Sequence, residues 1–381
     1  MILPNKRTQD LLDCLTRSRL SFALYRLPWT DECLLVLQTT GDVEQLECIE
    51  ELNGKKGFVM APFCQSDEHP LVLIRPDVTA YDWEEISEAL TKLECADAVL
   101  TCTCNNVSSE LSPYVSEETN KLQYIEAFER FIRPLKEKEF QKLVLSRAAN
   151  KHIHSDFSPI GAFVRACNSY PRMMIYLCHT PASGTWLGST PEILLSGHGK
   201  EWHTVALAGT MPMQNEVMPT VWDKKNVEEQ EYVADYVRRV TKKFGSKLTE
   251  KGPYTARAGQ LVHLKTDFNF LLKNGDRLGE LLQELHPTPA VCGLPKEEAF
   301  EFILENEGHE RSYYSGITGW LDPENGTDLY VNLRCMEIRP SEVTLYAGGG
   351  ILASSEAESE WEETEAKMKT MRSIINGWNV K

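Results

Sequence analysis

Three charged residues near the C-terminal end of the chain have the spacing of one helix stripe. In SSEAESEWEETEAKMKTMRSII, Glu360, Glu363 and Lys367 stand at i, i+3 and i+7, positions that share one side of an α-helix. The stretch AGGGI (347–351) lies just before them and could direct backbone N–H groups toward an anion. The pattern therefore indicates either a solvated charged helix face or part of a site for an anion and a metal ion.

A second acidic segment could supply a further carboxylate. KKNVEEQEYVADYV (224–237) has helical periodicity, and Glu228, Glu229 or Glu231 could face the first cluster. Oxygen ligands from two helices suit Mg²⁺, which takes one or two protein carboxylates and keeps water or substrate oxygens. The sequence thus predicts a Mg²⁺ site, with the choice among these three glutamates open.

Two more residues could transfer protons. Lys142 opens the apolar strand KLVLSRA, where it could extend to solvent or lie in a cleft as a base with a lowered pKa. Glu192 opens the apolar run EILLSG after a proline, and it is either a solvated charge or a general acid with a raised pKa. The turn LAGT (207–210) alone is weak evidence for a site, because such turns are common.

The loop HPTPAVCG (286–293) is predicted to be rigid. Its two prolines each fix φ and lack an N–H donor, and its glycine permits φ > 0, so a helix interior is excluded. It is either a simple turn between elements or the wall of a pocket.

The elements that must hold these residues alternate between strand clusters and helices. The helices are predicted from the helical spacing of their apolar residues. Ser355 and Glu358 have the spacing of a capping box, which predicts a helix start near Glu356. Residues 105–120 are polar and form the best linker candidate. The pattern favours an α+β fold with largely antiparallel sheets. Strands are expected at 33–40, 57–63, 70–76, 142–148, 173–180, 184–189, 192–197, 327–339 and 343–348, and helices at 121–138, 225–244 and 296–306.

Composition excludes several classes of partner. The 381 residues include 40 Lys and Arg against 56 Asp and Glu, a net charge of −16, which disfavours nucleic acids and anionic membranes. The 11 cysteines include Cys102 and Cys104 but form no paired C-x-x-C sets, so reduced thiols in a cytoplasmic protein are expected. No export signal or membrane span is expected.

Ten segments occur in the order and approximate spacing of a known family. The chain resembles the chorismate-utilising enzymes, which include isochorismate synthases, salicylate synthases and the first components of anthranilate and aminodeoxychorismate synthases. The resemblance covers roughly residues 120–377. It implies two sheet-and-helix halves around one deep site, with 121–381 as the chorismate-binding region and 1–120 as a weakly matched part of the same fold. The segments are FQKLVLSRA, LGSTPEILL, LAGT, KNVEEQEYV, VHLKT, HPTPAVCG, RSYYSGITGW, NLRCMEI, YAGGGI and EWEETEAKM.

Within this family the chain is most similar to the isochorismate synthases. They add water at C2 of chorismate and expel the C4 hydroxyl, and the resemblance implies Lys142 as the base and Glu192 as the acid. Aminodeoxychorismate synthases carry a nucleophilic lysine where this chain has Ala208. The loop with Ala290 is of the isochorismate synthase type, and a small residue there would leave C2 open to water.

The resemblance also implies the remaining site residues. Glu229 and Glu363 are expected to bind Mg²⁺, Glu360 to act through water, and Lys367 to orient the carboxylates. Arg334 and Tyr314 are expected to grip the enolpyruvyl carboxylate. The other expected substrate contacts are Ala208, Gly209, Thr210, His263, Ala290, Gly348, Gly349 and Gly350.

The sequence is also compatible with other functions within this family. A salicylate synthase is the closest rival, followed by an anthranilate or aminodeoxychorismate synthase, and then by an inactive family member that serves as a binding subunit. The reaction could serve menaquinone, siderophore or salicylate synthesis. The family resemblance favours a monomer.

Overall fold

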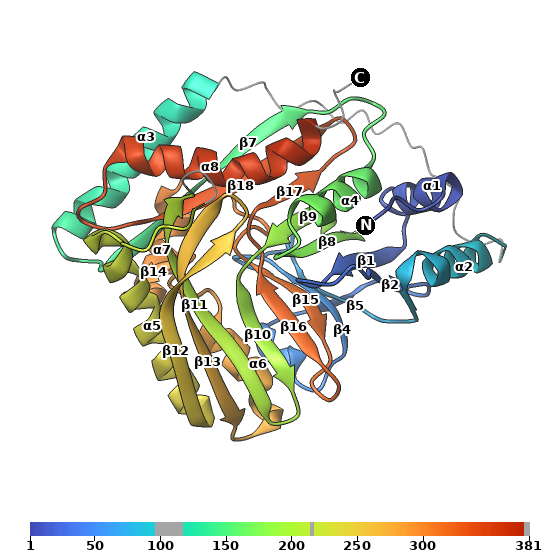
Figure 1. Cartoon of the computed structure of the whole chain (residues 1–381), viewed down its shortest axis with the longest axis horizontal. Helices are drawn as coiled ribbons and strands as arrows, with labels where there is room; N and C mark the ends of the chain where they lie inside the picture. Colours follow the sequence, from blue (N-terminus) through green and yellow to red (C-terminus); the bar gives the residue numbers. More distant parts are fainter. Residues whose placement is uncertain (96–116, 214–216, 377–381) are drawn as a thin grey trace.

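The computed structural model describes residues 1–95, 117–213 and 217–376. Their strands form two nine-stranded sheets in which the paired strands run antiparallel (Figure 1). Sheet A has the order β14 (Gly293–Leu294), β7 (Lys142–His152), β18 (Glu342–Ile351), β17 (Cys335–Ile338), β9 (Gly184–Thr190), β8 (Met174–Thr180), β1 (Ser21–Arg26), β2 (Leu34–Gln38) and β6 (Val78–Tyr81). Sheet B has the order β12 (Gly245–Ala258), β13 (Leu261–Leu272), β11 (Glu201–Pro212), β10 (Ile193–His198), β16 (Thr327–Val331), β15 (Ile317–Leu321), β4 (Gly57–Ala61), β5 (Leu71–Ile74) and β3 (Glu44–Leu46).

The sheets face each other, and helices cover their outer faces. Between the sheets lies an aromatic-rich core that includes Phe58, Tyr176 and Trp186. The outer face of sheet A packs on α1 (Lys6–Leu15), α2 (Asp82–Cys95), α4 (Pro159–Ser169) and α8 (Ala357–Asn376). The outer face of sheet B packs on α5 (Lys224–Phe244), α6 (Leu278–Leu285) and the 3-10 helix η1 (Ile49–Leu52). The helices α3 (Glu117–Lys136) and α7 (Lys296–Asn306) cover the β7 end of sheet A. A second 3-10 turn, η2 (Gly275–Arg277), precedes α6.

The predicted α+β class with antiparallel sheets is confirmed. One prediction needs correction: residues 327–339 do not form one strand, because the chain leaves sheet B after Val331 and enters sheet A at Cys335. The helix α8 begins at Ala357, close to the predicted start. There the Ser355 hydroxyl accepts a hydrogen bond from the Leu352 N–H and Glu358 pairs with Lys121.

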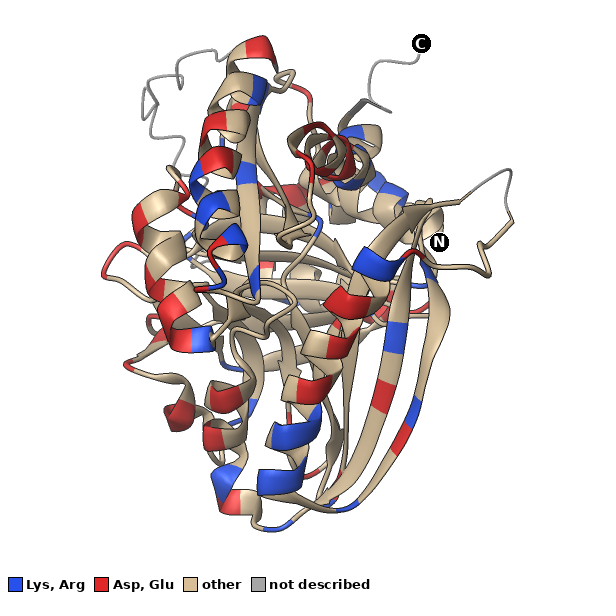
Figure 2. Cartoon of the chain, turned by 90° about the vertical axis from the view of Figure 1, so that its left-hand side faces the viewer, with Lys and Arg blue, Asp and Glu red and all other residues tan. Residues whose placement is uncertain are grey.

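Some predictions fall on residues that the structure does not describe. The linker candidate 105–120 lies outside the described residues except for its last four, which begin α3, and Cys102 and Cys104 lie outside them entirely. The free thiols among the described residues include Cys14, Cys33, Cys48, Cys64, Cys167, Cys178, Cys292 and Cys335. None of the described helices is long and apolar enough to cross a membrane. Figure 2 shows acidic and basic residues interspersed along the helices on one side of the molecule.

Candidate active site

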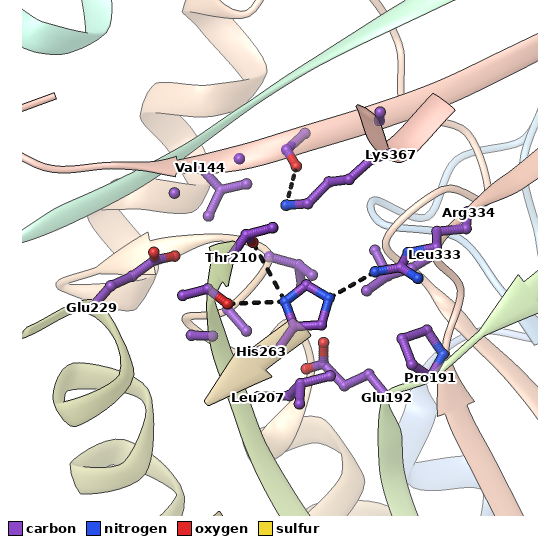
Figure 3. A pocket seen from close by; sticks show the side chains of 18 of the residues that line it. Val144, Pro191, Glu192, Leu207, Thr210, Glu229, His263, Leu333, Arg334 and Lys367 are labelled. Atoms are coloured by element: carbon purple, nitrogen blue, oxygen red, sulfur yellow. Dashed lines mark hydrogen bonds between the residues drawn. The ribbon is translucent and has the colours of Figure 1, made fainter. Parts of the chain in front are cut away.

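A cavity lies between the two sheets, and both sheets contribute to its lining. It contains every predicted substrate contact, together with Glu192 and Glu229 (Figure 3). Its lining consists of Val144, Pro191, Glu192, Leu207, Ala208, Gly209, Thr210, Glu229, His263, Ala290, Val291, Tyr314, Leu333, Arg334, Tyr346, Ala347, Gly348, Gly349, Gly350 and Lys367. The structure therefore gathers residues that are up to 223 positions apart, from Val144 to Lys367, at one place.

The glycine stretch of β18 forms one wall of the cavity. Pairing of β18 with β17 ends at Leu345, whereas its pairing with β7 continues to Ile351. A Cβ atom at Gly350 would lie 2.0 Å from Glu229 Oε1 and 2.9 Å from Lys142 Cε. A side chain at this position would displace both charged groups, so glycine is favoured there.

Lys142 and Glu229 form an ion pair behind this glycine. Lys142 is fully buried, and its Nζ lies 3.0 Å from Glu229 Oε1, although not in hydrogen-bond geometry. Solvent exposure of Lys142, one of the two readings of the sequence, is therefore wrong. Its closest charged partner is the carboxylate of Glu229.

The helix α8 brings two more carboxylates to the same wall. Glu360 Oε1 accepts a hydrogen bond from Lys225 Nζ at 2.6 Å, and Glu363 Oε1 accepts one from Lys367 Nζ at 2.7 Å. A Cβ atom at Gly349 would lie 3.2 Å from Glu363 and 3.4 Å from Glu360. Each of the three carboxylates thus has one lysine beside it.

The two α8 glutamates differ in acidity. Burial disfavours ionisation of Glu363, but Lys367 and Lys225 outweigh burial and lower its pKa. Burial and the nearby charge of Glu363 raise the pKa of Glu360, against the opposing effect of Lys225.

These carboxylates fit the chemistry of a Mg²⁺ site. The donors are oxygens, and the buried Glu360 Oε2 has no hydrogen-bond partner among the described residues. The three glutamates do not form a compact cage. Among the described residues, the group whose ligand atoms all lie within 4.8 Å is Glu68, His69 and Glu310 at the surface. An ion that takes only one or two protein carboxylates does not require such a cage.

The structure also separates the three candidates on α5. Glu229 is buried and lines the cavity. Glu228 accepts a hydrogen bond from Tyr232 on the same helix, and Glu231 is exposed. Glu229 is therefore the one of the three that faces the α8 carboxylates.

Glu192 lies on the opposite sheet, just before β10. Its side chain is buried in the cavity lining, and burial raises its pKa to about 8, against the opposing charges of Lys142, Lys367 and Arg334. A carboxyl group with this pKa holds its proton at neutral pH, as a general acid must. Solvation of Glu192, the other reading of the sequence, is therefore wrong.

Arg334 and His263 are joined by a hydrogen bond in which the Arg334 guanidinium donates to His263 Nε2 at 2.7 Å (Figure 3). His263 Nδ1 lies 2.9 Å from the carbonyl oxygen of Gly209. A histidine that donates from Nδ1 and accepts at Nε2 is neutral, which agrees with the strong lowering of its pKa by burial and by Arg334. Arg334 lies where the chain crosses between sheets, with φ of 47°.

The segment LAGT (207–210) is not the predicted turn: it lies within β11 and is held by α5. Gly209 has φ of +71° within an irregular part of the β11–β13 pairing, a conformation that favours glycine. The Thr210 N–H donates to Asn226 Oδ1 at 2.8 Å, and Asn226 is itself held by Asp223 at the start of α5. Asn226 is thus one turn before Glu229 and connects two parts of the cavity wall.

The loop 286–293 is tightly bonded and places Ala290 and Val291 on the cavity wall. Arg311 donates to the carbonyl oxygens of Val291 and Val144 at 2.7 and 2.9 Å, and Glu307 accepts two hydrogen bonds from Arg311. The loop is therefore a pocket wall as well as a connection.

Sequence reasoning missed several residues of this site. Tyr346 lines the cavity and stacks on Tyr314 with ring centroids 5.6 Å apart. Lys225 pairs with Glu360. Its place in the sequence KKN at the start of the acidic segment 224–237 could have identified it as a site residue. Asn226 and Arg311 act through the backbone, for which the sequence carries no clear signal.

Comparisons with known proteins find several similar chains. The family model described as chorismate binding enzyme matches residues 64–376. The isochorismate synthase EntC of Escherichia coli (strain K12) is 32% identical over 210 residues, which cover 52% of this chain and 54% of EntC. DhbC of Bacillus subtilis (strain 168), an isochorismate synthase, is 34% identical over 196 residues, 49% of each chain. These alignments thus span about half the length of the curated relatives.

A solved structure shares the fold over nearly the whole chain. It is described as a 2,3-dihydroxybenzoate-specific isochorismate synthase, DhbC, from Bacillus anthracis, with a TM-score of 0.75 and 22% sequence identity. The alignment covers 97% of this chain and 100% of that one.

Proposed function

The chain belongs to the chorismate-binding enzyme family, and on this premise we propose that it is an isochorismate synthase. The reaction would be the Mg²⁺-dependent, reversible conversion of chorismate to isochorismate. The isochorismate synthases of Escherichia coli and Bacillus subtilis, at 32% and 34% identity, support this assignment.

The observation that carries the proposal is the placement of two proton-transfer groups on different sheets. Lys142 opens β7 of sheet A, and Glu192 precedes β10 of sheet B, with the cavity between the sheets. Addition of water at C2 requires a base, and departure of the C4 hydroxyl requires an acid. Lys142 is close enough to Glu192 to lower its pKa, yet burial keeps that pKa near 8.

We assign the role of base to Lys142 and that of acid to Glu192. Lys142 would accept the proton of the attacking water, and Glu192 would protonate the leaving hydroxyl. A base must be in the amine form, so the ion pair with Glu229 would become a contact between an amine and a carboxylate. In the reverse reaction the two residues would exchange roles.

The remaining residues would bind and orient the substrate. Arg334 and Tyr314 would hold the enolpyruvyl carboxylate, and Arg334 is suited to this by its two-pronged donor geometry. Glu229 and Glu363 would hold Mg²⁺, with Glu360 acting through water and Lys367 orienting the carboxylates. When bound, Mg²⁺ would neutralise the ring carboxylate of the substrate in a strongly acidic protein.

Water is favoured over an amine as the nucleophile. Ala208 lines the cavity without an amine that could attack the ring, and the side chain of Ala290 is small. The enolpyruvyl group should therefore be retained in the product.

The test is incubation with chorismate and Mg²⁺, with product identification by chromatography. We expect isochorismate in equilibrium with chorismate, no pyruvate in an assay coupled to lactate dehydrogenase, and no response to ammonium or glutamine. Stoichiometric pyruvate with salicylate would assign the chain to the salicylate synthases instead. An aminated ring would show that the role of Lys142 is misassigned, and full activity in excess EDTA would contradict the Mg²⁺ site.

A further inference from the structure

We propose that Arg147 is a positioning residue that fixes the rotation of α8 and so aims the carboxylates of Glu360 and Glu363 at the cavity. The inference rests on the proposed function, because it takes these two residues as part of a divalent-cation site. Arg147 itself does not line the cavity; it extends from the opposite face of β7.

The side chain of Arg147 contacts three residues of α8. Its Nε donates to Thr364 Oγ1 at 2.7 Å, and its terminal nitrogen donates to the Glu365 carboxylate. The guanidinium carbon lies 3.8 Å from the ring centroid of Trp361, within the range of a cation–π contact. One buried side chain therefore bonds to or stacks on three residues of a single helical turn.

These contacts control the acidic face because of sequence adjacency. Trp361 directly follows Glu360, and Thr364 directly follows Glu363. Successive residues of an α-helix are about 100° apart, so fixing Trp361 and Thr364 fixes the direction of the two glutamates. The carboxylates of those glutamates lie 3.2 and 3.4 Å from the position that a Cβ atom on Gly349 of β18 would take.

The other supports of this turn do not replace Arg147. Tyr124 of α3 packs edge-on against Trp361 at a centroid distance of 5.5 Å. Arg372 also donates to Glu365, but from within α8. A bond between two residues of the same helix cannot set the rotation of that helix against the sheet. Arg147 can set this rotation, because it belongs to the strand β7 of sheet A.

Only a planar guanidinium can make all of these contacts. It donates in two directions within one plane while its face stacks on an indole. A lysine at this position keeps the charge but loses the fixed geometry. Arg147→Lys therefore tests positioning rather than electrostatics.

The test is a titration of the purified full-length protein with Mn²⁺, followed by electron paramagnetic resonance of the free ion. We expect Arg147→Lys to weaken Mn²⁺ binding by about 10- to 100-fold, the usual cost of losing a residue that orients metal ligands. Arg372→Lys is the matched control, since it also removes a guanidinium from Glu365, and it should bind Mn²⁺ like the wild type. Circular dichroism and thermal unfolding establish that each variant is folded.

Thr364→Val provides a second, milder change. It removes the hydrogen bond to Arg147 Nε with little change in volume, so it should weaken Mn²⁺ binding in the same direction but less, and it decides the matter if Arg147→Lys does not fold. Wild-type affinity in the folded Arg147→Lys or Thr364→Val protein, or an equal loss in Arg372→Lys, would overturn the proposal. Failure of the wild type itself to bind Mn²⁺ would overturn both this proposal and the assigned metal site, and this result is distinct from a failure of Arg147 alone.

Discussion

Glu192, which lines the cavity, and Glu363, which lies next to its Gly349 wall, have opposite acidities. Burial raises the pKa of Glu192 to about 8, whereas Lys367 and Lys225 hold the pKa of Glu363 below its usual range. Glu363 has an ammonium group 2.7 Å away, whereas the cations that act on Glu192 do not overcome its burial. A contacting cation outweighs burial at Glu363, whereas at Glu360 the ammonium of Lys225, 2.6 Å away, does not.

The difference divides the cavity into two chemical regions. The α8 side holds carboxylates beside lysines, which suits a cation and negatively charged ligands. The β10 side holds a carboxyl group that retains its proton. Glutamate therefore suits two kinds of chemistry here, cation binding on α8 and proton donation beside β10, and the element that carries it determines which one.

The largest expected effect comes from removing the proton-transfer groups. Glu192→Gln keeps the size of the side chain but cannot release a proton, and Lys142→Ala removes the base. Each should lower kcat by about 10²- to 10⁴-fold, while chorismate still binds in a calorimetric titration. Turnover close to the wild-type rate in either variant would exclude that residue from proton transfer.

The pH dependence of stability should expose the raised pKa of Glu192. Between about pH 4.5 and 8 the unfolded chain has lost this proton and the folded chain retains it, so the folded state is destabilised as pH rises. The free energy of unfolding of the wild type should fall relative to that of Glu192→Gln by roughly 1.4 kcal/mol per pH unit in this window. Urea denaturation of both proteins at several pH values measures the difference, and parallel curves would contradict it.

Glu363→Gln should affect the cation rather than the fold. It removes a carboxylate charge next to Lys367, so the Mg²⁺ concentration for half-maximal activity should rise by about 10-fold or more. The free energy of unfolding should change little, because the amide can still accept a hydrogen bond from Lys367. An unchanged Mg²⁺ requirement would remove Glu363 from the metal site.

The smallest effect is expected from Gly349→Ala, which should change the free energy of unfolding only slightly. An added Cβ would approach the ends of Glu363 and Glu360 at 3.2 and 3.4 Å, and flexible side-chain ends can move. Gly349→Ala should therefore cost less than about 1 kcal/mol of stability, whereas Gly350→Ala, at 2.0 Å from Glu229, should cost about 1–3 kcal/mol. Thermal unfolding of the two variants tests this order, and a larger loss in Gly349→Ala would reverse it.

The sequence was most informative where a local pattern had one physical meaning. Helical spacing predicted α3, α5, α7 and α8, and apolar runs predicted strands such as β2, β7 and β8, but the strands β12, β13 and β15 were not predicted. The strand β1 in SFALYR was missed, although it lies inside sheet A, because a run of six buried residues has no alternation. The switch of sheets around Arg334 could not be predicted, since strand partners are distant in sequence.

The sequence was also less informative about contacts within the site than about which residues belong to it. Residue types and motifs pointed to the residues that now line one cavity, but not to their pairing. The contact of Lys142 with Glu229 and the contact of Lys225 with Glu360 depend on how α5 and α8 pack against the sheets. Pairwise distances of this kind follow from tertiary packing, which a single sequence does not reveal.

Several paired strands are far apart in the sequence, and this has a consequence for folding during synthesis of the chain. The strand β4 pairs with β15, and β1 pairs with β8, so early apolar strands must wait for partners made much later. At the usual rate of translation, β4 would wait on the order of ten seconds or more. During that time the edge of GFVMA that later pairs with β15 would be unpaired, and such edges are prone to aggregation. Newly made chains should therefore depend on chaperones more than a protein of this size with local strand pairing would.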